Sequence, residues 1–155
     1  MATNRKKLQY FRKMLSEDLD NVMQLESLAY PFPWKRKLFE DSLSKPSYTC
    51  WVFENKDKFS GYLISSAAAG EAHILNLCIH PELQGQGWGR KLLAEAEWIA
   101  KQHRADTCFL EVRVSNHAAL HLYETSGYNE IGRRKKYYPA KKGREDAIVM
   151  AKVLI

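Results

Sequence analysis

Three glycines stand within five positions of the sequence and directly precede what reads as a helix. Gly85, Gly87 and Gly89 follow Gln84 in the stretch HPELQGQGWGRKLL at positions 80–93. A bare backbone at the start of a helix points free N–H groups outward, with the positive end of the helix dipole behind them. Each glycine costs folding entropy, so a plain turn rarely needs three. The stretch predicts a binding loop for a diphosphate.

The spacing of these glycines excludes two common phosphate loops. The P-loop requires GxxxxGK[ST], and the dinucleotide fingerprint requires GxGxxG. Here the third glycine comes one residue early, and Arg90 stands where the dinucleotide fingerprint would have its last glycine. The chemistry of anion binding still applies, because it depends on free backbone N–H groups at a helix start rather than on one glycine spacing.

The elements that position this loop follow from hydrophobic periodicity and turn residues. Helices are expected at about 17–29, 35–43 and 88–103, and from a cap at Ser115-Asn116 to near Gly127. Strands are expected at about 10–15, 50–54, 59–67, 72–79, 106–114, 128–135 and 146–153. This order indicates a mixed α/β fold in a single domain over residues 1–155, with a strand–loop–helix–strand unit at its centre.

Periodicity also assigns side chains to faces. In the first helix the apolar residues recur at helical spacing and should share one face: Leu19, Val22, Leu25 and Leu28. In the strand at 106–114 alternate residues fall into two sets, Thr107, Phe109, Glu111 and Arg113 against Cys108, Leu110, Val112 and Val114. The apolar set and the set with Glu111 therefore lie on opposite faces of the sheet.

Composition bounds the class of protein. The chain has 155 residues, 45% of them hydrophobic, and a net charge of +6. No apolar run approaches the roughly 20 residues of a membrane span. The first seven residues are charged and no apolar segment follows them, so no secretory signal is visible and we expect a cytoplasmic protein. Three cysteines without CxxC spacing predict buried thiols rather than a metal or redox site.

The residues at 84–89, QGQGWG, match the Q/R-x-x-G-x-G/A acetyl-CoA motif of the GNAT N-acetyltransferase superfamily. Other segments resemble a narrower family, the ribosomal-protein-alanine N-acetyltransferases of the RimI type. They are Phe32-Pro33-Trp34, Leu110-Glu111-Val112-Arg113, Ser115-Asn116, residues 118–124, Gly127-Tyr128, Tyr137-Tyr138-Pro139 and residues 143–148. The resemblance extends over about residues 8–152.

This resemblance implies a GNAT acyltransferase fold with a central, mostly antiparallel twisted sheet. We expect about six to seven strands with splayed middle strands and about four flanking helices. It also implies acetyl-CoA as cosubstrate and no metal. The residues expected to bind the coenzyme are Leu77, Cys78, Ile79, Gln84, Gly85, Gln86, Gly87, Trp88, Gly89, Arg90 and Asn116.

The resemblance implies Glu111 as general base, acting through water, and Tyr123 as the acid that protonates the coenzyme A thiolate. The reference pKa of a phenol, about 10, exceeds that of a typical thiol, so Tyr123 stays able to donate. Two structural alternatives stay open: an ion pair of Glu111 with a basic neighbour such as Arg113, and simple packing of Tyr123. Trp34 and the tyrosines at 137 and 138 could wall a peptide slot or pack in the core.

The acceptor follows from pKa values. An α-amino group titrates about 2.5 units below a lysine, which saves about 3.4 kcal/mol of deprotonation. A single glutamate therefore suits a peptide N-terminus, and the family acts on the N-terminal alanine of a small-subunit ribosomal protein. The alternatives are a lysine or small-molecule amine as acceptor, or a basic RNA-binding module, which the run Arg133–Lys136 allows. We expect no direct nucleic-acid or membrane partner and, by default, a monomer.

Overall fold

The computed structural model describes residues 9–155, so the charged segment at 1–7 lies outside the described residues. In chain order the elements are β1 (Gln9–Lys13), η2 (Ser16–Asp18), α1 (Leu19–Ala29), α2 (Arg36–Ser44), β2 (Tyr48–Asn55), β3 (Lys58–Ala68), β4 (Glu71–Ile79), η3 (Pro81–Leu83), α3 (Trp88–Gln102), β5 (Thr107–Arg113), α4 (His117–Thr125), β6 (Asn129–Pro139) and β7 (Arg144–Val153). The predicted mixed α/β order is confirmed element by element.

The described strands form one seven-stranded sheet in the order β1-β2-β3-β4-β5-β7-β6. Strand β1 pairs antiparallel with β2, and β7 pairs antiparallel with both β5 and β6. The pairing of β4 with β5 is parallel and covers four residue pairs, from Glu71↔Thr107 to Ile74↔Leu110. The predicted number of strands is confirmed, while the splay of the middle strands stays a prediction.

Two tight turns set the register of the strands that lead to the glycine loop. Lys56 and Asp57, between β2 and β3, have φ values of 53° and 61°. Ala69 and Gly70, between β3 and β4, have φ values of 53° and 82°. Positive φ at both central residues is typical of the type I′ turn, whose twist suits antiparallel strands. The polar segment at residues 55–58 is therefore a hairpin turn.

The chain divides into two compact units, each of which is described by itself. The first comprises the residues up to Ser65 together with Asn76–Leu93. The second comprises Ser66–Leu75 and Ala94–Ile155. The expected single-domain organisation remains a prediction.

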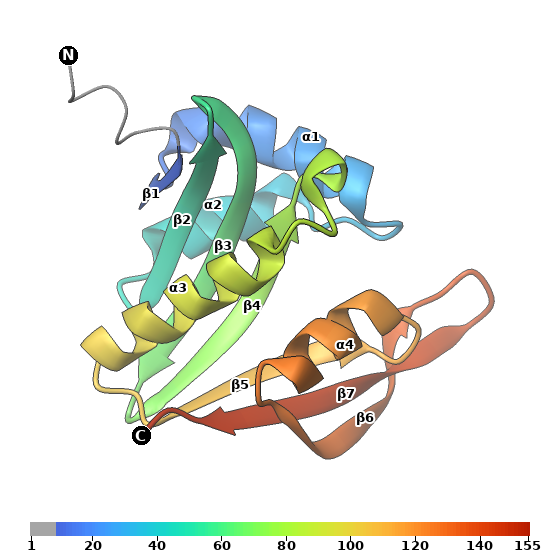
Figure 1. Cartoon of the computed structure of the whole chain (residues 1–155). Coiled ribbons are helices and arrows are strands. Elements are labelled where there is room, and N and C mark those ends of the chain that lie inside the picture. Colours follow the sequence, from blue (N-terminus) through green and yellow to red (C-terminus); the bar gives the residue numbers. More distant parts are fainter. Residues whose placement is uncertain (1–8) are drawn as a thin grey trace. The chain divides into compact units, whose positions relative to one another are not determined.

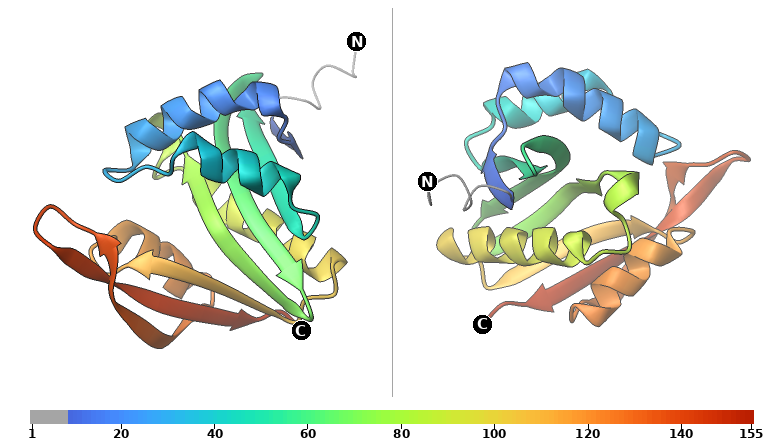
Figure 2. Two further views of the ribbon diagram at one scale, coloured as in Figure 1. Left: turned by 180° about the vertical axis from the view of Figure 1, so that it is seen from behind. Right: turned by 45° about the horizontal axis from the view of Figure 1, so that its top comes forward.

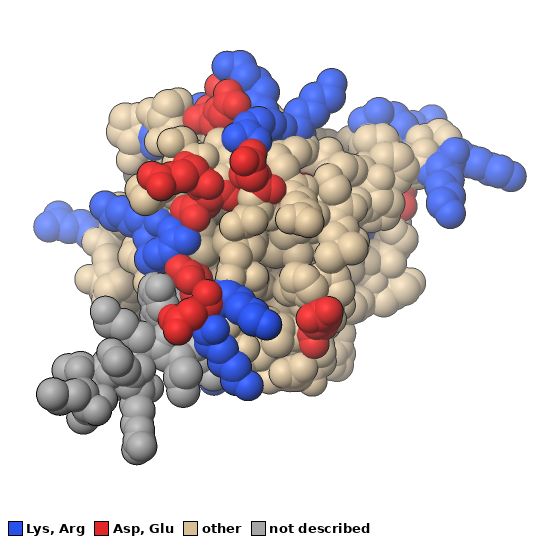
Figure 3. Space-filling model, turned by 90° about the horizontal axis from the view of Figure 1, so that it is seen from above, with Lys and Arg blue, Asp and Glu red and all other residues tan. Residues whose placement is uncertain are grey.

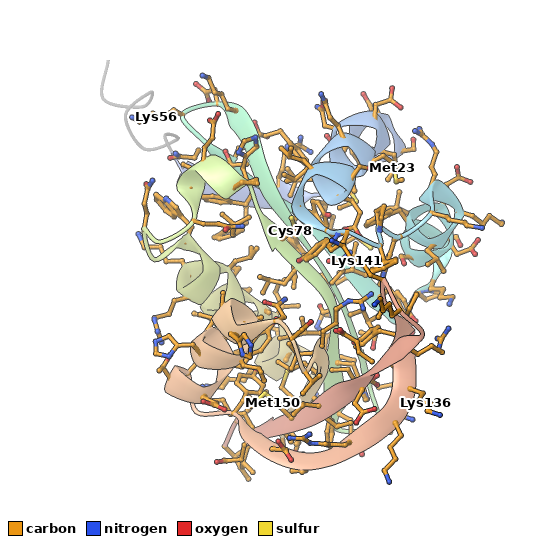
Figure 4. All side chains as sticks on the ribbon, turned by 90° about the vertical axis from the view of Figure 1, so that its right-hand side faces the viewer. Met23, Lys56, Cys78, Lys136, Lys141 and Met150 are labelled. Carbon is orange, nitrogen blue, oxygen red and sulfur yellow. The ribbon has the colours of Figure 1, made fainter. Side chains whose placement is uncertain are left out.

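In the first unit, α1 and α2 cover one face of β2 and β3, and the start of α3 crosses the opposite face (Figures 1 and 2). The buried cluster under α1 and α2 consists of Met14, Leu19, Val22, Leu25, Phe39, Cys50, Val52, Tyr62, Ile64 and Cys78. Aromatic pairs lie on both faces of the sheet. The ring centroids of Phe39 and Tyr62 are 5.7 Å apart in an edge-on arrangement, and those of Phe53 and Trp88 are 5.2 Å apart. In Figure 4, Cys78 lies on β4 in the interior of this unit.

The predicted apolar face of α1 is wrong at one position. Leu19, Val22 and Leu25 are buried as expected, but Leu28 is 61% exposed. Glu26 is buried in its place, with 1% of its surface exposed. Helical spacing allows both Leu25 and Glu26 to face the sheet, and polar partners beneath the helix decide which side chain enters.

The outer surface of α1 and α2 carries paired charges. Arg36 contacts Asp20 at 2.7 Å and Glu40 at 3.5 Å, and Lys37 contacts Asp41 at 3.0 Å. Acidic and basic side chains accordingly lie side by side in the space-filling view (Figure 3). Because these pairs are exposed, each contributes little to stability.

In the second unit, α4 lies against β5 and β7 (Figure 1). The burial of β5 alternates as predicted, with Cys108, Leu110 and Val112 buried and Glu111 on the other face. Strand β6 is the edge of the sheet and extends to Pro139, beyond its predicted end at 135. A charged edge strand resists pairing with other chains, which accounts for the basic run in structural terms.

Neither a membrane helix nor a metal cluster is found between residues 9 and 155. No helix there is long and apolar enough to cross a membrane. No group of three or more His, Cys, Asp or Glu side chains in this range could hold a metal ion.

The predicted burial of the three thiols is confirmed, and their reactivity provides a test. Burial raises the pKa of Cys50 to about 11, of Cys78 to about 12 and of Cys108 to about 11. Since the thiolate is the reactive form, native protein at pH 8 should react with a thiol reagent at least tenfold more slowly than free cysteine. Three thiols should react at once in denaturant. Rapid labelling of any thiol in the native protein would contradict this.

Candidate active site

In the first unit the end of β4 is held against β3. The thiol of Cys78 is buried, and His80, the residue after β4, donates its backbone N–H to the Ser60 carbonyl at 2.8 Å. Opposite Cys78, a Cβ added to Gly61 would lie 2.5 Å from the Cys78 carbonyl oxygen. Only glycine permits this approach of β3 to β4. Sequence reasoning missed Gly61, although a glycine inside a strand is a signal of close backbone contact.

The glycine loop owes its composition to backbone conformation. Gly85 has φ of 76° and Gly87 of 86°, and no atom lies within 4 Å of a Cβ built on either. Space is therefore available, but the left-handed conformation disfavours any other residue. Gly89 differs, because it lies in the first turn of α3 and is not among the residues with positive φ.

The predicted loop leads directly into the first turn of α3. The Gly87 carbonyl accepts the Lys91 N–H at 3.2 Å, which closes the first helical turn. In an α-helix the first backbone N–H groups are directed toward the helix start, where an anion can accept from them. In α3 these groups follow directly after the left-handed glycines, as the diphosphate prediction requires.

Side chains around the loop support its shape. The Trp88 ring packs on Phe53 and lies under the Lys91 ammonium, 4.5 Å from the ring centre. Gln86 donates from its side-chain amide to the Glu82 carbonyl at 3.2 Å. The ring of His80 accepts the Glu82 N–H at 3.1 Å and so caps the turn η3. His80 thus has a structural role.

In the second unit Glu111 has one engaged and one open carboxylate oxygen. Its Oε1 lies 3.3 Å from Nε of Arg134, while its Oε2 is buried and has no hydrogen-bond partner in the described chain. The expected alternative partner, Arg113, instead contacts Glu145 at 3.5 Å. The ion pair therefore exists but with a different arginine, which β6 brings across from the edge of the sheet.

Tyr123 lies in α4 and is buried, with 8% of its surface exposed. Burial, followed by the nearby Cys108 thiol, raises the pKa of Tyr123 to about 12. Its ring meets that of Tyr128 edge-on at 5.9 Å. The residue therefore packs in the core and also remains a protonated donor.

A β-bulge brings the two tyrosines of β6 to Glu111. The register runs from Arg134↔Ala147 to Tyr138↔Glu145, which leaves three β6 residues opposite Asp146 alone. Within the bulge Lys136 has φ of 50°, and its N–H donates to the Asp146 carboxylate at 2.9 Å. Figure 4 shows the Lys136 side chain projecting outward. Bulges of this kind re-aim neighbouring side chains.

Electrostatic coupling links these tyrosines with the predicted catalytic pair. Burial, and then Glu111, raises the pKa of both Tyr137 and Tyr138. Tyr123 contributes to the same shift at Tyr138. The Arg113 guanidinium lies 4.5 Å from the Tyr138 ring centre and donates to the Pro139 carbonyl at 2.6 Å. The second unit therefore gathers the proposed base, the proposed acid and both tyrosines.

Three other residues have defined places. The Asn116 side-chain oxygen accepts the Ala119 N–H at 3.1 Å and caps α4, so its helix-cap role is confirmed and a coenzyme contact stays a prediction. His73 stacks on Phe109 at 5.2 Å. Trp34 packs on Phe39 at 5.2 Å, while part of its surface remains exposed.

Comparison with known proteins assigns this arrangement to a family. Residues 19–128 match the acetyltransferase (GNAT) family. The ribosomal protein bS18-alanine N-acetyltransferase of Escherichia coli strain K12 is 37% identical over 134 residues, which cover 86% of this chain and 90% of the relative. The enzyme of the same name from Haemophilus influenzae is 35% identical over 135 residues, covering 86% and 91%.

The fold agrees with this assignment. The crystal structure of the ribosomal-protein-S18-alanine N-acetyltransferase from Escherichia coli matches with a TM-score of 0.87 and 34% identity, over 94% of each chain. The chain therefore belongs to the GNAT acetyltransferase family. It is an acetyl-CoA-dependent N-acetyltransferase, and the fold class inferred from the sequence is confirmed.

The left-handed glycines predict a specific loss of coenzyme affinity. In Gly87→Ala the required backbone conformation costs roughly 1–2 kcal/mol, so the dissociation constant for coenzyme A should rise about tenfold in calorimetry. Gly132→Ala is the matched control, because Gly132 has no positive φ and open space at its Cβ. Equal affinity of both variants would show that the loop does not hold the coenzyme.

Proposed function

We propose that this chain acetylates the N-terminal alanine of a small-subunit ribosomal protein by direct attack of the amine on acetyl-CoA. The curated relatives named for this activity support the substrate class. The N–C bond forms as the thioester C–S bond breaks, Glu111 takes the amine proton and Tyr123 protonates the departing sulfur. Such an enzyme meets both substrates in the cytoplasm.

The environment of Glu111 is the observation that carries this proposal. Arg134 occupies one carboxylate oxygen and leaves Oε2 open in a buried position. A buried oxygen that lacks a donor is costly unless something fills the place. A water molecule that relays the amine proton fits this chemistry, because it donates to Oε2 and accepts from the amine.

The environment of Tyr123 suits the acid. With its pKa raised to about 12, the phenol still holds its proton at about pH 8, where the amine becomes neutral. A protonated phenol can therefore give its proton to the departing thiolate. The structural alternative of packing holds as well, since the ring contacts Tyr128.

The coenzyme is assigned to backbone groups of the first unit. The backbone N–H groups at the start of α3 suit the diphosphate. The residues Leu77, Cys78 and Ile79 offer strand-type hydrogen bonds to the pantetheine arm, and one of their N–H groups is the oxyanion donor. Gln84 and Arg90 are exposed on either side of the glycine loop and are assigned to the phosphates of the coenzyme. Tyr137, Tyr138 and Trp34 are assigned to the acceptor peptide.

A panel of acceptors tests the substrate class. The enzyme is incubated with acetyl-CoA and alanine-starting peptides, and in parallel with Nα-blocked peptides that contain lysine and with small amines. Acetylation of the α-amine alone supports the proposal. Transfer only to blocked lysine peptides or to small amines would replace it with the alternative acceptor, and absence of acetyl-CoA binding by calorimetry would overturn it.

Substitution of the two catalytic candidates should separate base from acid. Glu111→Gln should lower kcat by about 10²–10⁴, because general-base catalysis typically contributes that factor. Tyr123→Phe removes only the hydroxyl and should lower kcat with little change in the dissociation constant for acetyl-CoA. Single-turnover kinetics provide the measurement. Full turnover in the double variant would disprove both roles.

The pH profile of the wild type should report the raised pKa of Tyr123. The rate should rise to about pH 8 as the acceptor α-amine loses its proton. It should then stay level to pH 10.5, because Tyr123 with a pKa of about 12 remains protonated there. Samples returned to pH 8 control for unfolding. A reversible decline with a midpoint near pH 10 would indicate an ordinary phenol or a different acid.

A further inference from the structure

Glu26 is a buried carboxylate that the proposed chemistry does not use. It lies on the inner face of α1 and is 1% exposed. No lysine or arginine of the described chain forms an ion pair with it. Burial of a carboxylate without a cation is costly unless hydrogen bonds satisfy its oxygens. An apolar side chain on this face would join helix and sheet at lower cost.

Three donors from three different segments satisfy this carboxylate. Oε1 accepts the hydroxyl of Tyr62 on β3 and the side-chain amide of Asn76 on β4, the latter at 2.9 Å. Oε2 accepts the backbone N–H of Trp34 at 2.9 Å. One oxygen thus binds the sheet, and the other binds the loop that joins α1 to α2.

That loop offers few backbone donors. Pro31 and Pro33 supply no N–H groups, so Phe32 and Trp34 are the only backbone donors between residues 31 and 34. The Trp34 N–H is committed to Glu26, and the Trp34 ring packs on Phe39. The carboxylate therefore fixes the one point at which the Trp34 backbone is hydrogen-bonded to α1.

The sheet side of the same link leads directly to the proposed thioester segment. Asn76 immediately precedes Leu77 in β4. The Leu77 carbonyl accepts the hydroxyl of Tyr30 at 2.5 Å, from the residue that ends α1. The loop and the residues assigned to the pantetheine arm are thus joined at two points, and Glu26 is one of them.

We propose that Glu26 is a positioning residue for the acceptor: it holds the Phe32-Pro33-Trp34 loop in register with Asn76 and the β4 residues that follow. This inference rests on the proposed function, which assigns Trp34 to the acceptor. Glu26 does not touch the reacting atoms. Its loss should therefore weaken acceptor binding more than coenzyme binding.

Two variants of Glu26 and one control test this. Glu26→Met has a side chain of similar volume but accepts none of the three hydrogen bonds. Glu26→Gln keeps only one oxygen that can accept a hydrogen bond, so it cannot bond to both the sheet and the Trp34 N–H. The KM for the acceptor should rise about tenfold or more in Glu26→Met and less in Glu26→Gln. The KM for acetyl-CoA should stay within about twofold, since β3 still holds the end of β4.

Tyr62→Phe is the matched control, because it removes one donor to the same carboxylate and leaves the Trp34 bond in place. It should lower Tm without raising the acceptor KM. Hydrogen exchange of the Trp34 amide should accelerate in both Glu26 variants and not in Tyr62→Phe. If all three variants lower Tm alike and leave the acceptor KM and this exchange rate unchanged, Glu26 only stabilises the fold.

Failure of the proposed function is a separate outcome. If the wild type acetylates an amine other than a peptide N-terminus, the KM for that amine is the readout, and the positioning role is tested all the same. If wild-type protein does not bind acetyl-CoA in calorimetry, the proposed function fails and the acceptor role of Glu26 fails with it. Hydrogen exchange at Trp34 then distinguishes a loop anchor from a merely buried charge.

Discussion

The contact between Gly61 and the Cys78 carbonyl is the constraint on which the proposed coenzyme site of the first unit depends. A Cβ at position 61 would lie 2.5 Å from that oxygen, so β3 and β4 approach as they do only because the side chain is a hydrogen atom. The end of β4 leads through η3 into the left-handed glycines and the start of α3. A shift of Cys78 would therefore move every backbone group assigned to acetyl-CoA.

The same unit uses buried polar groups where an apolar pattern would be cheaper. Glu26 of α1 is buried in the core, and Leu28 lies on the surface. Tyr62, Asn76 and the Trp34 N–H offset the cost of the buried carboxylate. In exchange, an irregular loop with two prolines obtains a defined position, which hydrophobic contacts alone specify less sharply because they are not directional.

In the second unit the edge strand decides the electrostatics. Arg134 contacts Glu111 from the part of β6 that precedes the bulge at Lys136. After the bulge, Arg113 contacts the Tyr138 ring and the Pro139 carbonyl. The basic run Arg133–Lys136 thus has two effects. It keeps an exposed edge strand from pairing with other chains, and it supplies the cation beside the proposed base.

The sequence by itself determined the order of elements, the glycine loop, the burial of the thiols and the two faces of β5. These features follow from hydrophobic periodicity, from turn residues and from motifs whose residues are close neighbours in the chain. Its motifs also indicated the GNAT family correctly, since the residues that make up each motif are close neighbours in the chain.

Only the tertiary structure decided which charge meets Glu111, which residue of α1 is buried and why Gly61 must be glycine. Each of these depends on atoms brought together from distant segments: Arg134 is 23 positions from Glu111, and Asn76 is 50 positions from Glu26. The packing of α1 on the sheet and the register of the strands bring these residues together. No hydrophobic periodicity or motif within one segment predicts such contacts, because their energies depend on residues of another segment.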